Sequence, residues 1–340
     1  MGAEVSGQRT VDGVLLDLGS TLFNQRDVPA VKPKKGLTGL YVAKRSKKGA
    51  GNAPATVTAN GIRGKLGSIA KRTPQVMVKI SGGGKSMAQI KNHLDYISRN
   101  GKLEVEDQDG ATVTGRDELQ ELKEEWRVGG FPIPDESNKR EAFNIVLSMP
   151  EGTPALAVKR AARDFAAAEF TDHQYVMVLH TFDTDPDPVP SKHPHVHLAV
   201  KATSLDGTRL NPRKADLQRW REGFARALQE HGVEAAATNR QQRLSQRKRG
   251  EKQSVRHMRD RGEDLQQVGR SAPDKKRIAK AKGTEADVLK GYREIAKALS
   301  RSDVDADVQL ADALVKRLRE TQKGERGKEV QKDRGTDRQR

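Results

Sequence analysis

The sequence predicts an α+β fold in which helices flank a central antiparallel sheet. Between residues 74 and 240, short runs of β-branched and apolar residues alternate with segments whose apolar residues recur at helical spacing. The run "KLEVEDQDGATVTG" has the alternation and the turn residues of a hairpin, which joins antiparallel strands. Both flanks are strongly charged and poor in apolar residues. We therefore expect a folded domain over 74–240, a basic and largely disordered arm over 1–73, and a basic, partly helical extension over 241–340.

The elements of the expected domain follow from the pattern in chain order. The segment "SMAQIKNHLDYISRNGK" has helical spacing, with Ser86 and Gln89 as a capping box and Gly101 at its end. "RDELQELKEEWRV" is typical of an exposed helix, and Thr153 with Pro154 suits the start of a helix through "ALAVKRAARDFAAAEF". "KADLQRWREGFARALQEHG" is a third amphipathic helix. Strands are expected at 74–81, 141–150, 174–180 and 193–202, with the proline-rich loop "TFDTDPDPVPSK" between the last two.

The two flanks carry most of the unbalanced positive charge. Residues 32–72 hold 11 Lys or Arg and no Asp or Glu, and residues 239–280 hold 14 Lys or Arg against five acids. Two helices are expected at 285–300 and 304–320, followed by the polar tail "DRGTDRQR". The segment over 32–72 is expected to be disordered, because it is basic and has little apolar surface to bury.

The composition points to a polyanionic partner and excludes several classes of site. The formal charge is +17, only 34% of residues are hydrophobic, and 4% are aromatic. There is no cysteine, which excludes disulfides and thiolate metal sites and fits a cytoplasmic protein. No apolar run approaches the length of a membrane span, so membrane insertion is not expected. Nucleic acid is the favoured partner, and a merely basic surface is the alternative.

The histidines are concentrated in one stretch, "HPHVHLAVK". In a strand, residues i and i+2 point to the same face, so His195 and His197 project side by side. His180 ends the preceding strand and comes beside them if the two strands pair. Three neutral imidazoles at one point form a metal site with open coordination positions. The acids Asp183, Asp185 and Asp187 in the intervening loop are placed to orient an imidazole or to take a proton.

Two other interpretations of the histidines stay open at this point. They are ordinary surface residues, or they belong to a cupin-like metalloenzyme acting on a small molecule. A cupin would carry a Glu three or four residues after its second His, where this chain has Lys201 and Ala202. The basic flanks would also remain unexplained.

A tyrosine and a glycine-rich loop are the other candidate functional features. Tyr96 lies off the apolar stripe of its predicted helix, with Arg99 one turn later, and a tyrosine hydroxyl becomes a nucleophile when a base or a metal activates it. An amphipathic surface tyrosine is the alternative. The loop "SGGGKS" lacks the Walker A spacing, which excludes that mode of ATP binding. Its backbone amides and Lys85 would suit a phosphate, and a plain turn is an equal alternative.

Three segments carry a resemblance to a known family. "LDYISRNGKLEVED" contains Tyr96, "NIVLSMPEGTP" contains Ser148, and "VLHTFDTD" with "HPHVHLAVK" contains the three histidines. In this order they resemble the motifs of conjugative relaxases of the HUH endonuclease superfamily, in the mobilisation-nuclease branch that includes T-DNA border endonucleases. The resemblance covers about 74–240. One departure is the long loop "FDTDPDPVPSK", which leaves open whether Asp183 or Asp185 takes the acidic role.

The resemblance implies an HUH relaxase fold and a relaxase that nicks one DNA strand at a transfer origin. Tyr96 would attack the scissile phosphate and form a 5′-phosphotyrosyl link, with Asp183 assisting. The metal ligands would be His180, His195 and His197, holding Mg²⁺ or Mn²⁺. The expected DNA contacts are Lys85, Arg99, Lys102 and Ser148. Alternatives are a rolling-circle replication initiator of the same superfamily and a non-catalytic nucleic-acid-binding protein, which would need no metal and form no adduct.

The resemblance also implies partners. They are single-stranded or supercoiled DNA at the origin, an accessory origin-binding protein, and the coupling protein of a type IV secretion system. The expected compartment is the bacterial cytoplasm, with transfer of the protein into a recipient cell alongside the DNA.

Overall fold

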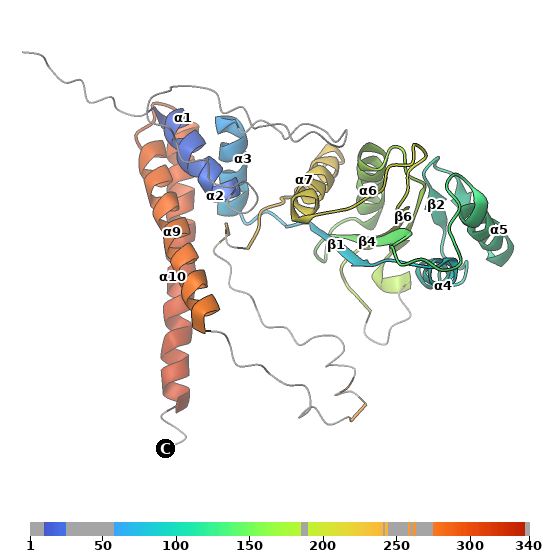
Figure 1. Ribbon diagram of the computed structural model, residues 1–340. Helices are drawn as coiled ribbons and strands as arrows, with labels where there is room; N and C mark the ends of the chain where they lie inside the picture. The colour runs from blue at the N-terminus through green and yellow to red at the C-terminus, as the bar shows by residue number, and fades with distance from the viewer. Residues whose placement is uncertain are drawn as a thin grey trace, which may run out of the picture. The chain divides into compact units, whose positions relative to one another are not determined.

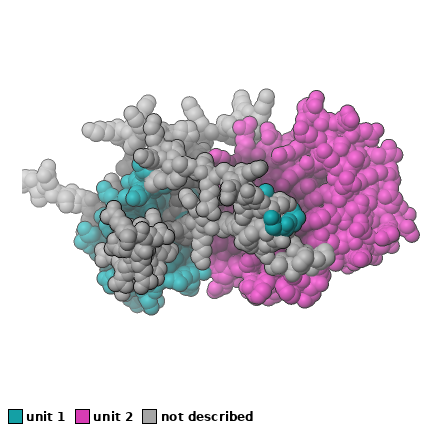
Figure 2. All heavy atoms as spheres, turned by 90° about the horizontal axis from the view of Figure 1, so that it is seen from below, with its two compact units in different colours: residues 1–72, 238–340 teal, residues 73–237 magenta. Residues whose placement is uncertain are grey.

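The computed structural model describes residues 10–24, 58–184, 190–240, 242–243, 258, 261–262 and 275–336. The chain forms two compact units, which Figure 2 shows in different colours. One unit spans 73–237, and the other combines 1–72 with 238–340.

The unit over 73–237 is built on a six-stranded sheet in the order β1-β4-β6-β5-β2-β3 (Figure 1). All the strand pairs in this sheet are antiparallel, which confirms the α+β fold with a central antiparallel sheet. The strands are β1 (Met77–Gly82), β2 (Val105–Asp107), β3 (Thr112–Val113), β4 (Ala142–Ser148), β5 (Tyr175–His180) and β6 (His195–Lys201).

Helices cover both faces of this sheet, because alternate residues of β4, β5 and β6 enter two different cores. One core packs the sheet against α4 (Met87–Ser98) and α5 (Arg116–Val128), and the other packs it against α6 (Ala155–Glu169) and α7 (Lys214–Glu230). Val176 and Val178 face α4, whereas Tyr175 and Met177 face α6 and α7. The flanking helices expected from the sequence are therefore present, and the strand periodicity decides which face each side chain occupies.

The helix α4 begins and ends where its sequence requires. The Ser86 hydroxyl accepts the Gln89 N–H at 3.3 Å and caps the start. Arg99, Asn100 and Gly101 then follow in left-handed conformation, with φ of 54°, 58° and 80°. A Cβ at Gly101 would stand 2.3 Å from the Gly115 carbonyl oxygen, so only glycine fits. This sharp end places the last turn of α4 over the ends of β5 and β6.

The second unit is helical and joins both ends of the chain. It contains α1 (Val11–Val14), η1 (Leu15–Gly19), α2 (Ser20–Asn24), α3 (Ala59–Ala70), α9 (Lys275–Leu299) and α10 (Asp305–Thr336). Leu15, Ile62 and Leu66 are almost fully buried in one core with residues of α9 and α10. The Arg63 guanidinium clamps Asp307, with Nε 2.7 Å and Nη2 2.9 Å from the two carboxylate oxygens.

Within the arm expected over 1–73, residues 11–24 and 59–70 form these N-terminal helices. The apolar residues of 11–24 and 59–70 lie among glycines and basic residues, and their partners are more than 200 positions away in α9 and α10. Local pattern therefore gives no sign of their burial. Residues 25–57 lie outside the described part of the chain. The C-terminal extension is helical as expected, and none of the described helices has the length and apolarity needed to cross a membrane.

Candidate functional site

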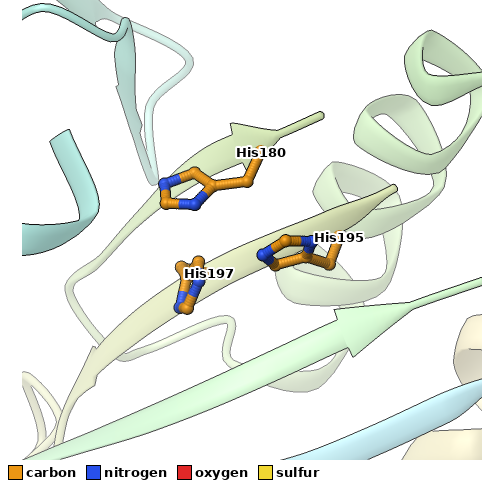
Figure 3. Close-up of side chains that lie close together, drawn as sticks. All are labelled: His180, His195 and His197. Carbon is orange, nitrogen blue, oxygen red and sulfur yellow. The ribbon is translucent and has the colours of Figure 1, made fainter. Parts of the chain in front are cut away.

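Three histidines from two neighbouring strands point toward one another at the end of the sheet (Figure 3). His180 is the cross-strand partner of His195, and His197 lies two residues further along β6 on the same face. The ring of His180 lies 4.5 Å from that of His197 and 5.2 Å from that of His195, measured between centroids. One nitrogen from each ring lies within 4.8 Å of the others. The structure thus brings the three expected ligands together.

Hydrogen bonds to backbone carbonyls orient two of these rings. His180 Nε2 lies 2.6 Å from the Ile97 carbonyl oxygen, and His195 Nδ1 lies 2.9 Å from that of His193. Each contact favours the tautomer that donates to the carbonyl and leaves the lone pair on the opposite nitrogen. For His180 this nitrogen is Nδ1, and an Arg99 guanidinium nitrogen lies 3.5 Å from it. His197 Nδ1 is buried and has no hydrogen-bond partner among the described residues.

The electrostatics keep His197 uncharged. Burial, followed by the neighbouring His180 and His195, lowers the pKa of His197 from 6.5 to about 3. A neutral imidazole is the form that binds a metal ion, so no proton has to leave His197 at neutral pH. The donor set is therefore three imidazole nitrogens, two of them oriented by carbonyls and one buried without a partner, and this set fits a divalent transition metal.

Tyr96 lies on the last turn of α4, beside this cluster. Leu94 and Ile97 of the same helix are 1% and 0% exposed in the core below, whereas Tyr96 is 56% exposed. Its ring centroid lies 6.1 Å from that of His197 at an interplanar angle of 90°. The Arg99 guanidinium carbon lies 4.8 Å from the Tyr96 ring centroid.

An open groove of about 730 Å³ runs past Tyr96. Its lining includes Arg99 and Lys102, two of the residues expected to contact DNA, and Thr184 of the short helix η2 (Phe182–Thr184). The Asp95 carboxylate also lines this groove and pairs with the Lys123 ammonium at 2.5 Å. The groove thus combines the exposed Tyr96 side chain with basic side chains, and such a lining suits a phosphodiester backbone.

Lys85 lies at the opposite end of α4 from Tyr96, roughly 15 Å away along the helix axis at 1.5 Å per residue. The glycine loop before it is shaped by packing. The Gly84 N–H donates to the Ala142 carbonyl at 3.1 Å, and the Lys85 N–H donates to the Gln89 side chain at 2.9 Å. A Cβ at Gly83 would stand 2.5 Å from the same Ala142 oxygen. The plain-turn interpretation therefore fits the loop better than a phosphate cradle does.

The remaining predicted site residues differ in how far they are exposed to solvent. Ser148 lies on β4 and is the cross-strand partner of His195 on β6. Its side chain is 5% exposed, and its hydroxyl donates to the Met149 carbonyl at 3.4 Å. A direct DNA contact from Ser148 therefore needs a rearrangement. Asp183 is exposed on η2, three residues after His180. Asp185 and Asp187 lie outside the described residues.

Two other residues of the same types, His193 and Tyr175, have side chains directed elsewhere. His193 precedes β6, and its Nδ1 accepts the Glu151 N–H at 2.9 Å, so it holds the turn that leads toward α6. Tyr175 is 3% exposed in the core on the opposite face of the sheet. Burial raises its pKa, so the phenolate is disfavoured there. Of the two tyrosines in the unit over 73–237, Tyr96 is the one that lies beside the histidines.

His93 is a neighbour of the cluster that the sequence reasoning missed. It lies three residues before Tyr96 on α4, and its ring centroid is 6.3 Å from that of Tyr96 and 6.4 Å from that of His197. Burial lowers its pKa from 6.5 to about 4. The i, i+3 spacing from the candidate nucleophile is the signal that would have identified it.

Comparisons with known proteins find similar sequences over the unit that carries this cluster. Residues 96–233 match the family model "Relaxase: MobA/VirD2-like, nuclease domain". The T-DNA border endonuclease VirD2 of Agrobacterium fabrum is 30% identical over 224 residues, which cover 57% of this chain and 48% of the relative. VirD2 of Rhizobium radiobacter is 30% identical over 191 residues, covering 50% of this chain and 43% of the relative. VirD2 of Rhizobium rhizogenes is 31% identical over 192 residues, covering 50% and 42%. The chain spans about half the length of these relatives or slightly less.

Proposed function

We propose that this chain, whose residues 96–233 match the model of a MobA/VirD2-like relaxase nuclease domain, nicks one DNA strand at a transfer origin with the Tyr96 hydroxyl as nucleophile. The observation that carries this proposal is the exposed Tyr96 ring, 6.1 Å from that of His197, beside a cluster of three imidazoles. This arrangement favours a nicking enzyme over a non-catalytic DNA-binding protein, which needs neither feature. The VirD2 relatives are named as T-DNA border endonucleases, which supports cleavage of DNA.

The proposed reaction is a transesterification. The Tyr96 oxygen bonds to the scissile phosphorus, and the bond from that phosphorus to the 3′ oxygen breaks. The products are a 5′-phosphotyrosyl link and a free 3′-OH, because the departing oxygen takes up a proton. One phosphate ester replaces another, so the step needs no ATP. The phenol proton passes to a base, and Asp183 is the candidate whose position near β5 is described.

Arg99 and Lys102 have distinct parts in this proposal. Both line the groove beside Tyr96, where they can pair with non-bridging oxygens of the strand. Arg99 also lies against the Tyr96 ring, so in this proposal it contacts both the nucleophile and the phosphate that the nucleophile attacks. A fixed cation at this point stabilises charge that develops on the phosphate in the transition state.

His180, His195 and His197 would hold a divalent metal ion, and such an ion supplies Lewis-acid polarisation of the phosphate when bound. Imidazole nitrogens favour transition metals, so Mn²⁺ fits this donor set better than Mg²⁺. The carbonyls of Ile97 and His193 keep two of the rings facing inward.

The wider setting of this activity is also a proposal. We place the protein in the bacterial cytoplasm, acting on supercoiled or single-stranded origin DNA with an accessory origin-binding protein. Passage to a recipient cell would need the coupling protein of a type IV secretion system. The charge of +17 supports the DNA partner through non-specific, salt-sensitive binding.

The test is covalent adduct formation. The full chain is incubated with Mn²⁺ or Mg²⁺ and a supercoiled plasmid carrying the DNA that flanks its own gene. DNA-linked protein is then sought on a denaturing gel. Tyr96→Phe should abolish the adduct and leave DNA affinity nearly unchanged, because only the exposed hydroxyl is lost. The matched control is Tyr175→Phe, which should still form it. An adduct that survives in Tyr96→Phe would refute the assignment, and no adduct under any condition in the wild type would favour the non-catalytic alternative.

A further inference from the structure

The His93 ring lies beside both the candidate nucleophile Tyr96 and the cluster residue His197. It is stacked on the Tyr96 ring at an interplanar angle of 23°, with 6.3 Å between the centroids. It meets His197 edge-on at 69°, with 6.4 Å between the centroids. Since Tyr96 and His197 are also 6.1 Å apart, the three rings contact one another in a closed triangle.

The support behind the two α4 rings is unequal. Leu94, next to His93, is 1% exposed in the core below the helix, and the His93 ring itself is half-buried. The Tyr96 side chain projects beyond the core and is 56% exposed. An exposed tyrosine on an open helix surface occupies several rotamers unless a neighbour holds it. The neighbours that the structure gives the Tyr96 ring are His93, Arg99 and His197.

Stability alone does not explain an imidazole at this position. His93 Nε2 is buried and has no hydrogen-bond partner among the described residues. A buried nitrogen without a partner lowers stability, whereas a phenyl ring of similar width would carry no such penalty. His93→Phe is therefore expected to fold at least as stably as the wild type, which makes it an informative variant.

We propose that His93 is a positioning residue whose ring holds the Tyr96 side chain in its attack orientation beside His180, His195 and His197. The inference rests on the proposed role of Tyr96 as nucleophile. His93 acts through Tyr96 and does not contact the reacting phosphate. Because a displacement of about 1 Å can cost a reaction on the order of 100-fold, loss of the stacking ring should appear in the chemical step.

The experiment is single-turnover cleavage of an origin-strand oligonucleotide in Mn²⁺, with the protein in saturating excess. His93→Ala should cleave about tenfold to a hundredfold more slowly. Its affinities for the oligonucleotide and for Mn²⁺ should equal those of the wild type. His93→Phe should keep the rate within about threefold, because it keeps a ring against Tyr96. The control is His173→Phe, in the same unit, where a half-buried histidine ring lies 6.5 Å from Phe170.

A second measurement does not depend on activity. The chain has four tyrosines, so the ring resonances of ¹³C-labelled tyrosine are few, and the Tyr96 resonance is identified by its loss in Tyr96→Phe. His93→Ala should shift it, and His173→Phe should not. The proposal is overturned if His93→Ala leaves both the rate and this resonance unchanged, or if His93→Phe is as slow as His93→Ala. If the wild type forms no adduct at all, the proposed function fails, and the resonance still decides whether His93 holds Tyr96.

Discussion

Acid should destabilise the unit over 73–237 through two histidines of the site. Burial holds the pKa of His197 at about 3 and that of His93 at about 4 in the folded chain, against 6.5 when either residue is exposed. Between these values the unfolded chain binds protons that the folded chain does not. Stability is therefore lost as the pH falls from about 7 toward 4, and neither residue contributes above pH 7.

The magnitude follows from the same shifts. At pH 5 the unfolded state has taken up nearly one proton at each residue and the folded state almost none. Each histidine then costs about 2 kcal/mol relative to pH 8, at about 1.4 kcal/mol per pKa unit. Both rings are partly exposed, so solvent reduces this to about 1–2 kcal/mol each.

The assay is urea unfolding in the presence of a chelator at several pH values from 8 to 5, followed by tryptophan fluorescence. Both tryptophans of the chain, Trp126 and Trp220, are buried in the unit over 73–237, so the fluorescence reports the unfolding of that unit alone. His197→Gln should lose less stability on acidification than the wild type, by about 1–2 kcal/mol at pH 5. Val178→Ala is the matched control, because Val178 is the cross-strand neighbour of His197 and does not titrate. It should lower stability equally at every pH. A His197→Gln chain with the wild-type pH dependence would refute the reasoning.

Three further predictions concern the cluster of three histidines, the end of α4 and the helical unit. His197→Ala should weaken Mn²⁺ binding more than about tenfold in calorimetry. His193→Ala should leave Mn²⁺ affinity unchanged, because His193 Nδ1 accepts the Glu151 N–H. Equal losses of Mn²⁺ affinity in the two variants would show that the proposed ligand set is wrong. Gly101→Ala should lower the free energy of unfolding by at least about 1–3 kcal/mol, because φ is 80° and the new Cβ would meet the Gly115 carbonyl; an unchanged urea midpoint would contradict this. A chain ending at Arg240 lacks α9 and α10. The α3 amides around Leu66 should then exchange with solvent hydrogen like those of an unfolded chain, while amides of the unit over 73–237 stay protected. Protected α3 amides in this shortened chain would show that the core of α3 does not depend on α9 and α10.

Local pattern was sufficient for the sheet that carries the site. Strands were expected at 141–150, 174–180 and 193–202, and β4, β5 and β6 lie inside those ranges. Alternation of the residues also fixed which face His195 and His197 share, because the period of a strand is two. The cross-strand pairing of His180 with His195 then follows from joining adjacent strands in an antiparallel pair.

The burial of the N-terminal helices against α9 and α10 could not be derived in this way. The core of the helical unit joins Ile62 and Leu66 to residues such as Tyr292 and Leu314, so each segment lacks a partner nearby in the sequence. A short segment that is basic and rich in glycine gives the same pattern whether or not distant helices cover it. Only contacts of long sequence separation distinguish the two cases, and those depend on the tertiary fold.

The glycine loop shows the converse difficulty, in which a local pattern suggests a site that tertiary packing removes. "SGGGKS" before a helix has the composition of a phosphate cradle, and sequence alone gives the plain turn equal weight. The structure decides between them through β4, because the Ala142 carbonyl accepts the Gly84 N–H and blocks any side chain at position 83. Gln89 uses the Lys85 amide in addition. The anion-binding potential of such a loop lies in its unpaired amides, so once two of them are satisfied internally the glycines serve close packing. The basic side chains that line the groove beside Tyr96, where a DNA strand could lie, are Arg99 and Lys102, at the other end of the same helix.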